Sequence, residues 1–259
     1  MTRPIIVTAL ATTPVKGLRV SAVDELRLEP DGVPDDRRFY LIDDRRRLVN
    51  GKHVGTLGTV IPTYRHADRT LTLTFPDGEV VEGVVRTGDK MTTLVFSRAQ
   101  QARPVLGPWS EALSAHFGRP LRLVEIVGDV GADRGHAGAV SLMSHASLTG
   151  FEDVAGLGAV DGRRFRMHVE IDGVVAHAED GWLGRRLRVG AALVRISGHI
   201  GRCSTTHRHP DTGVLDVPTL DILRSYRGGL NTTEPLAFGV YGEVLEAGTV
   251  ALGDAVELA

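Results

Sequence analysis

Short apolar runs, partly alternating with polar residues and bounded by proline or glycine, recur along this chain. Residues 5–7, 24–28 and 71–75 are three of them. Alternation with a period of two places successive side chains on opposite faces of a β-strand, and proline and glycine favour turns between strands. Many short strands with few helices predict a β-rich α+β fold, with barrels favoured over repeated βαβ units.

Three stretches instead carry apolar residues at helical spacing, each with a start signal and a glycine stop. In the first, Trp109, Leu113 and Phe117 recur every four residues. We expect this helix to serve packing. The three predicted helices are bounded by Pro108 and Gly118, by Ser144 and Gly156, and by Asp216, with Pro218 in the first turn, and Gly228.

One predicted strand covers residues 165–171. Its apolar positions alternate with Arg166, His168 and Glu170. Because side chains alternate across a strand, Arg166 and His168 are expected to share one face. That face is a candidate lining for a site.

A length of 259 residues allows one large β-rich domain or two smaller ones. The stretch 128–138 is rich in glycine and charged residues and has no hydrophobic periodicity. It therefore marks a break between structured segments near the middle of the chain. We therefore predict two domains, residues 1–127 and 128–259.

Composition narrows the class of protein. A formal net charge of -2, without a long run of one sign, argues against nucleic acid as the partner. The single cysteine permits no intrachain disulfide, as expected for a reducing compartment. The amino-terminal stretch lacks the pattern of a signal peptide, and no segment approaches the roughly 20 apolar residues of a membrane span. We expect a cytoplasmic protein that does not enter a membrane.

Residues 197–213 are the densest chemical segment, with the only thiol, three histidines and two arginines. Gly198 and Gly201 allow bends that bring the backbone close to a ligand, and Arg202 beside Cys203 favours a thiolate. Cys203 is therefore a candidate thiolate ligand or nucleophile.

Other interpretations of this segment stay open at this point. A lone cysteine is often a small buried apolar residue. Thiolate and imidazole groups also suit zinc or copper, although the spacing of these residues matches no common zinc pattern. A Cys-His hydrolase is a further possibility, but no oxyanion-hole or elbow motif supports it. The zinc or copper alternative would use His199, Cys203, His207 and His209.

Six motifs resemble, in order along the chain, those of the MOSC family, which includes molybdenum cofactor sulfurases and amidoxime-reducing components. Two resemble signatures of the family's N-terminal β-barrel domain, and four resemble the MOSC domain itself. Together they extend over nearly the whole chain. The motifs lie at residues 14–17, 36–40, 144–148, 164–166, 178–182 and 202–213.

This resemblance implies an N-terminal β-barrel-like domain followed by a MOSC β-barrel with a few short helices. It also implies a molybdenum cofactor, Mo-molybdopterin, held between the two domains with Cys203 as the protein ligand of the metal. Lys16, Arg37 and Arg38 match positions that hold the anionic end of the cofactor in relatives. Residues matching others near the pterin or its phosphate are Ser144, Ser147, Arg166 and Arg202.

These residue types suit an anionic ligand. Arginine presents a planar fork that holds two oxygens at once, and Ser144 at a helix start would add free N–H groups. The chain departs from relatives where it has Met167 and His168 in place of a common Pro-Asn pair. His207 and His209 make the rim basic at mildly acidic pH if they face the pocket; otherwise they are solvated loop residues.

The resemblance implies an oxidoreductase that reduces N-hydroxylated small-molecule substrates, with Asp180 or His168 assisting proton transfer. An iron-sulfur cluster needs about four cysteines. The electrons would therefore come from a separate flavin or iron-sulfur reductase. Two alternatives are a sulfur carrier with a persulfide on Cys203, supplied by a partner desulfurase, and a non-catalytic carrier of the cofactor.

Overall fold

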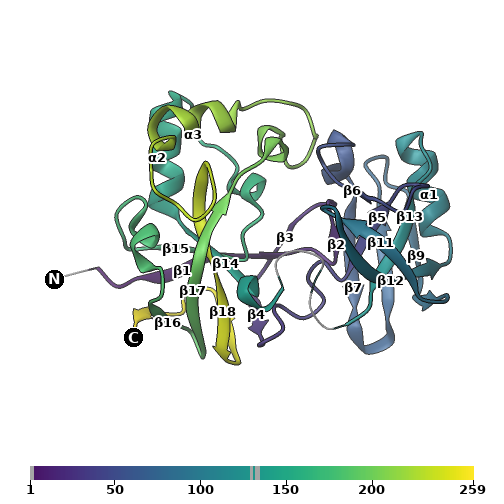
Figure 1. The fold of residues 1–259 in the computed structure, drawn as a ribbon, viewed down its shortest axis with the longest axis horizontal. Helices are drawn as coiled ribbons and strands as arrows, with labels where there is room; N and C mark the ends of the chain where they lie inside the picture. Colours follow the sequence, from purple (N-terminus) through teal and green to yellow (C-terminus); the bar gives the residue numbers. More distant parts are fainter. Residues whose placement is uncertain (1–2, 129–130, 132–134) are drawn as a thin grey trace.

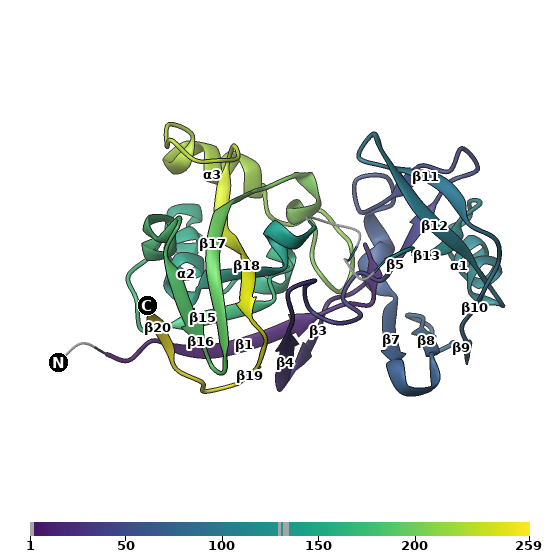
Figure 2. The ribbon, with the colours of Figure 1, turned by 60° about the horizontal axis from the view of Figure 1, so that its bottom comes forward.

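The computed structural model describes residues 3–128, 131 and 135–259. Figures 1 and 2 show two lobes, one built mainly from the first half of the chain and one mainly from the second. The predicted domain boundary falls beside residues 129–130 and 132–134, which lie outside the described residues. The division at residues 127 and 128 stays a prediction.

The carboxyl-terminal lobe contains one eight-stranded sheet, in which β14 and β15 are parallel and the other printed neighbours are antiparallel. In order across the sheet, the strands are β20 (Val256–Leu258), β16 (Arg186–Val189), β17 (Ala192–Gly201), β18 (Ala237–Glu246), β14 (Val140–Ser144), β15 (Val169–Asp172), β1 (Ile6–Thr12) and β3 (Ser21–Val23).

The first strand of the chain belongs to this carboxyl-terminal sheet. β1 pairs with β15, and its Val7 and Leu10 are buried in the same core as Ile171. A two-stranded sheet of β4 (Glu25–Leu28) and β19 (Gly248–Ala251) adds a second link of this kind. Residues 6–28 thus contribute strands to both lobes. The chain passes from β1 to β2 (Val15–Lys16) of the amino-terminal lobe and then returns to the carboxyl-terminal lobe with β3 and β4.

The amino-terminal lobe contains a seven-stranded and a three-stranded sheet around a core that includes Phe39 and Trp109. In order, the seven-stranded sheet consists of β10 (Arg86–Thr87), β12 (Arg98–Leu106), β13 (Arg122–Ile126), β5 (Phe39–Ile42) and β2 (Val15–Lys16); in addition, β11 (Met91–Val95) pairs with β12, and β6 (Leu48–Val49) pairs with β5. The three-stranded sheet consists of β7 (Ile61–Arg65), β8 (Thr70–Thr74) and β9 (Val80–Val84).

Three α-helices accompany the strands: α1 (Trp109–Phe117), α2 (His145–Ala155) and α3 (Thr219–Arg227). The fold is β-rich, as predicted, but the strand pairings among the described residues form no closed barrel.

Ser144 caps α2, and Gly156 ends it, as predicted. The predicted cap of α3 is wrong: Pro218 occupies that position, because Asp216 instead forms an ion pair with Arg164 at 3.0 Å. Within the described ranges, no helix has the length and apolar character to cross a membrane.

The predicted strand over residues 165–171 is also wrong in its first half. A 3-10 helix (Gly162–Phe165) precedes it, Arg166 adopts a left-handed conformation with φ 56°, and β15 begins only at Val169. Side chains distant in sequence fix this bend: Arg202 donates to the Phe165 carbonyl at 2.7 Å, and Arg37 donates to the Arg166 carbonyl at 3.0 Å. Local alternation could not reveal these partners.

The position of β1 predicts that the amino-terminal strand stabilises the carboxyl-terminal lobe. Leu10→Ala removes a side chain that is 1% exposed and should lower the free energy of unfolding by about 2–5 kcal/mol. Leu230→Ala, at a residue 50% exposed, is the matched control and should change it by less than about 0.5 kcal/mol. Urea denaturation of both variants measures the difference, and equal costs would contradict the assignment of Leu10 to this core.

Candidate functional site

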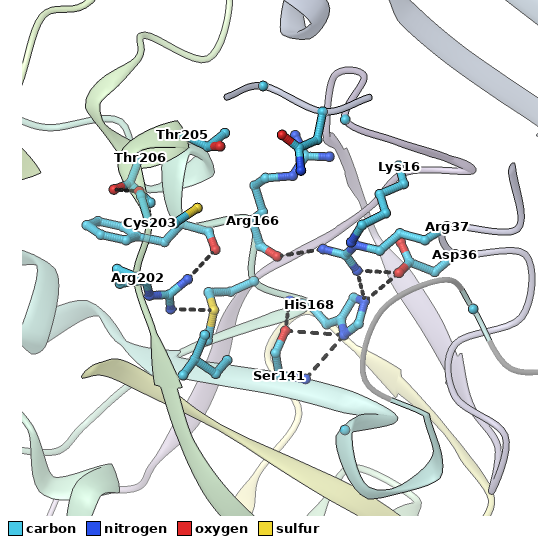
Figure 3. Close-up of a pocket in the computed structure, with 18 of the residues that line it drawn as sticks. Lys16, Asp36, Arg37, Ser141, Arg166, His168, Arg202, Cys203, Thr205 and Thr206 are labelled. Atoms are coloured by element: carbon cyan, nitrogen blue, oxygen red, sulfur yellow. Dashed lines mark hydrogen bonds and ion pairs between the residues drawn. The ribbon is translucent and has the colours of Figure 1, made fainter. Parts of the chain in front are cut away.

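A cavity of about 340 Å³ lies between the two lobes. Figure 3 shows Lys16, Asp36 and Arg37 on one side of it, Cys203, Thr205 and Thr206 on the other, and Arg166 between them. The amino-terminal lobe contributes loops beside β2, β5 and β6 and the β11–β12 hairpin. The polar, charged and aromatic residues that line the cavity come from both lobes: Lys16, Asp31, Asp36, Arg37, Asn50, Lys52, Phe96, Ser141, Arg164, Phe165, Arg166, His168, Arg202, Cys203, Thr205 and Thr206.

Cys203 lies where β17 gives way to a 3-10 helix (Ser204–His207). Its carbonyl accepts hydrogen bonds from the backbone N–H of Thr206 at 3.0 Å and from the Thr206 hydroxyl at 2.9 Å. These bonds fix the backbone that carries the half-buried thiol, which lines the cavity (Figure 3). The predicted candidate thiolate therefore faces the space between the lobes.

Arg202 also lines the cavity, but its guanidinium is directed at protein groups. It donates to the Phe165 carbonyl at 2.7 Å and, through Nε, to the Phe238 carbonyl at 2.8 Å, and it lies over the Phe165 ring at 5.2 Å from the centroid. These contacts hold the backbone before Cys203 against the turn that carries Arg166. They support a positioning role for Arg202 more directly than the predicted contact with an anion.

A buried network joins the lobes beside Cys203's cavity. Arg37 Nη1 donates to the carboxylate of Asp36, and Arg37 Nη2 donates to the Arg166 carbonyl. His168 Nε2 lies 3.0 Å from the same Asp36 oxygen. The other Asp36 oxygen accepts the Thr13 N–H at 2.9 Å. The amino-terminal lobe thus supplies the carboxylate and the arginine, and the carboxyl-terminal lobe supplies the histidine and the carbonyl.

The hydrogen bonds also define the tautomer of His168. Its Nδ1 accepts the backbone N–H of Ser141 at 3.2 Å, so Nδ1 carries no proton. The ring proton of the neutral imidazole is then on Nε2, which lies 3.0 Å from the Asp36 carboxylate and 2.9 Å from Nη1 of Arg37. His168 lines the cavity, as its predicted position beside Arg166 required, but its Nε2 is engaged by the Asp36–Arg37 pair of the network.

The charge of Asp36 is strongly favoured. Burial raises the pKa of this carboxyl, but the positive charge of Arg37, the contact with His168 and the Thr13 N–H outweigh burial and hold its pKa far below the ordinary value. Asp36 is therefore an anion at every physiological pH, and it fixes Arg37 in place.

Ser144 and Ser147 lie outside the cavity lining. Both are fully buried at the start of α2, where the Ser144 N–H and the Ser147 hydroxyl donate to Glu179 at 3.0 and 2.7 Å. A helix start attracts anions, and here the protein's own carboxylate occupies that position. The structure does not bring these serines together with Cys203.

Arg38 and Asp180 also lie outside the lining. Arg38 forms ion pairs with Glu125 at 2.6 Å and Asp35 at 3.3 Å. Asp180 forms an ion pair with Arg227 of α3 at 2.6 Å. Both side chains thus form ion pairs within their own lobes. Arg38 was predicted to contact the cofactor and Asp180 to assist proton transfer, but neither lines the cavity.

The alternative zinc or copper site finds no support. Among the described residues, no group of three or more histidine, cysteine or acidic side chains is arranged to hold a metal ion. His199, His207 and His209 instead accept backbone N–H bonds from Thr233, Leu220 and Asp211. Neither His207 nor His209 lines the cavity.

Five of the polar, charged or aromatic lining residues were missed by sequence reasoning: Asp31, Asn50, Lys52, Phe96 and Ser141. Asn50 and Gly51 form a dipeptide typical of turns, which was a usable signal for that loop. Phe96 had no such signal, because the two-residue turn that carries it contains neither glycine nor asparagine.

Comparisons with known proteins bear on the family. Solved structures similar to this chain include the YuaD protein of Bacillus subtilis, at 12% identity, TM-score 0.46 and coverage of 98% of this chain and 94% of that chain. YiiM of Geobacillus stearothermophilus has 22% identity, a TM-score of 0.34 and coverage of 47% and 54%. No curated protein matches the chain in the sequence search.

The model of the MOSC N-terminal beta barrel domain matches residues 5–119, and that of the MOSC domain matches residues 115–257. The predicted family is confirmed.

The Asp36 network predicts a stability that depends on pH. Asp36→Asn leaves Arg37 buried without its counter-charge and should lower the free energy of unfolding at pH 7 by about 3–5 kcal/mol. Because folding depresses the pKa of Asp36, the carboxylate's contribution is complete above its unfolded pKa, at about 4, and is lost as the pH falls below that value. Wild type and variant should therefore approach one another in stability in acid.

Chemical denaturation between pH 7 and pH 3 measures this convergence. Asp221→Asn is the control, because its ion pair with Arg224 is at the surface and should contribute less than about 1 kcal/mol. A constant difference between wild type and Asp36→Asn across this range would show that the charge of Asp36 is not what stabilises the network.

Proposed function

Because the chain belongs to the MOSC family, we propose that it binds a molybdenum cofactor in the cavity between the lobes, with Cys203 as the protein ligand of the metal. MOSC domains are associated with proteins that bind this cofactor. The observation that carries the proposal is that the only cysteine of the chain lines the same cavity as Lys16, Arg37 and Arg166.

The donor set of the cavity fits such a group. A thiolate is a soft ligand for a transition metal, and the anionic end of a pterin cofactor requires cationic partners. Lys16 and Lys52 approach from one lobe and Arg166 from the other, while Thr205 and Thr206 add hydroxyl groups. A volume of about 340 Å³ lies within the range of small-molecule sites.

When bound, the cofactor supplies two-electron oxidation and reduction. In the proposed activity, an N-hydroxylated substrate accepts two electrons and two protons, its N–O bond breaks, and water leaves. The chain has one cysteine and so cannot ligate an iron-sulfur cluster with about four. The proposal therefore includes a separate flavin or iron-sulfur reductase as electron donor.

The residues that line the cavity have distinct parts in this proposal. Cys203 ligates the metal, and the hydrogen bonds from Thr206 to its carbonyl orient it. Lys16, Lys52 and Arg166 hold the anionic end of the cofactor. Of the two predicted proton carriers, only His168 lines the cavity, but its two ring nitrogens are engaged by Ser141 and Asp36, so proton transfer is assigned to water. Asp180 is given no part, because its carboxylate is paired with Arg227.

The first test is the metal and pterin content of protein made in a host that synthesises the cofactor. Wild type should contain molybdenum and pterin in near-equal amounts. Cys203→Ala should lose molybdenum and, with it, reductase activity by more than the roughly 10–100-fold that loss of an outer-shell partner costs. Ser204→Ala, at the exposed neighbouring residue, is the control and should keep both.

The other outcomes would overturn this assignment. Full molybdenum and activity in Cys203→Ala would exclude the thiolate ligand, and zinc without pterin would exclude the cofactor. A persulfide on Cys203 without molybdenum would favour the sulfur carrier, whereas bound cofactor with no turnover under any reductant would favour the carrier of cofactor.

A second prediction separates two of the four arginines that sequence reasoning assigned to the cofactor. Arg166→Gln should lower pterin occupancy about tenfold, because it removes a charge-assisted donor from the cavity. Arg38→Gln should leave occupancy near that of wild type, because Arg38 pairs with Glu125 outside the lining. Pterin fluorescence after oxidation measures both, and an equal loss in the two variants would refute this division.

A further inference from the structure

The β11–β12 hairpin presents a strained aromatic residue. Val95 pairs with Arg98, so Phe96 and Ser97 form a two-residue loop, and both have positive φ, 49° and 65°. Such loops favour asparagine and glycine, and positive φ is rare and costly for a bulky side chain. Phenylalanine at this position is therefore opposed by the local backbone.

Packing does not explain the residue either. The Phe96 side chain is 55% exposed and belongs to none of the apolar core clusters. Among the exposed large apolar residues in the described part of the chain, it is the only aromatic one. Neither the turn nor the core thus accounts for an aromatic ring at the tip of this hairpin, and backbone strain of this kind tends to occur at functional positions.

The location of Phe96 suggests such a function. It lines the cavity that also contains Cys203 and Thr205 of the other lobe. Its ring lies 5.3 Å from Nζ of Lys16, measured to the centroid. A cation near the ring disfavours a second positive charge at the same place, while the remaining exposed ring surface can stack on a neutral planar group.

We propose that Phe96 is a specificity-determining residue that stacks on the ring of neutral, planar aromatic substrates at the cavity. This proposal rests on the function proposed above and names the substrate class within it: N-hydroxylated compounds in which the carbon that bears the N–O group carries an aromatic ring, in preference to aliphatic ones. An aromatic pair of this kind contributes a selectivity of about fivefold.

Two variants separate recognition from turn structure. Phe96→Asn places a residue favoured at this turn position and removes the ring, whereas Phe96→Tyr keeps the ring. The measured quantity is the ratio of kcat/KM for benzamidoxime to kcat/KM for acetamidoxime, its aliphatic counterpart. The ratio should fall about fivefold in Phe96→Asn, mainly through KM, and stay within about twofold of wild type in Phe96→Tyr.

The melting temperature provides a readout for a purely structural role. Phe96→Asn should melt at or above the temperature of wild type, because the backbone strain is relieved. If Phe96 served only the hairpin or Lys16, the two substrates would lose kcat/KM equally and the ratio would not change. That result, or a fivefold fall in Phe96→Tyr as well, would overturn the proposal.

Failure of the proposed reductase activity is distinguishable from failure of this inference. If wild type reduces neither compound, the activity proposed above is wrong, and the equilibrium Kd of benzamidoxime is then measured by titration without turnover. Kd should rise about fivefold in Phe96→Asn relative to both wild type and Phe96→Tyr. Equal Kd values in all three proteins, or no binding to wild type, would overturn the role of Phe96.

Discussion

The buried ion pair of Asp36 and Arg37, with His168 beside it, sets the geometry of the space between the lobes. The carboxylate and guanidinium come from one lobe, and the histidine and the Arg166 carbonyl come from the other. A buried charge that loses its partner is strongly destabilising, so the lobes cannot shift relative to one another here at low cost. Lys16 and Cys203 lie on opposite sides of the cavity that this contact adjoins.

Several residues that look suited to anions are used by the protein itself. Arg202 donates to two carbonyls, and the start of α2 holds Glu179. Arg38 pairs with Glu125. Residue type and spacing do not reveal which partner a charged group meets, because that partner comes from a distant part of the chain. Consequently, fewer cationic groups are available to bind the cofactor than the motifs alone suggested.

Local signals predicted local structure well. The bounds of α1 and α2 followed from apolar spacing, a serine cap and glycine stops, because these interactions lie within a few residues of one another. Long-range pairing was not predictable in the same way. No local pattern showed that β1 pairs with β15, or that Arg37 and Arg202 bend residues 162–168 away from the expected strand.

The candidate site was predicted in part for the same reason. The motifs led to Lys16, Arg37, Arg166, Arg202 and Cys203, and the alternation over residues 165–171 led to His168; all six line the cavity. They also led to Ser144, Ser147, Arg38 and Asp180, which do not line it. Phe96 lies at a turn that lacks turn-forming residues, so its position emerged only from the backbone of the hairpin.

The central claim is that the thiolate of Cys203 is a ligand of molybdenum, and X-ray absorption at the molybdenum edge tests it most directly. Wild type and Cys203→Ser would be isolated from the same cofactor-competent host, and the sulfur coordination would be normalised to molybdenum. The predicted result is one sulfur neighbour fewer in Cys203→Ser than in wild type. Identical sulfur coordination in the two proteins would contradict the claim.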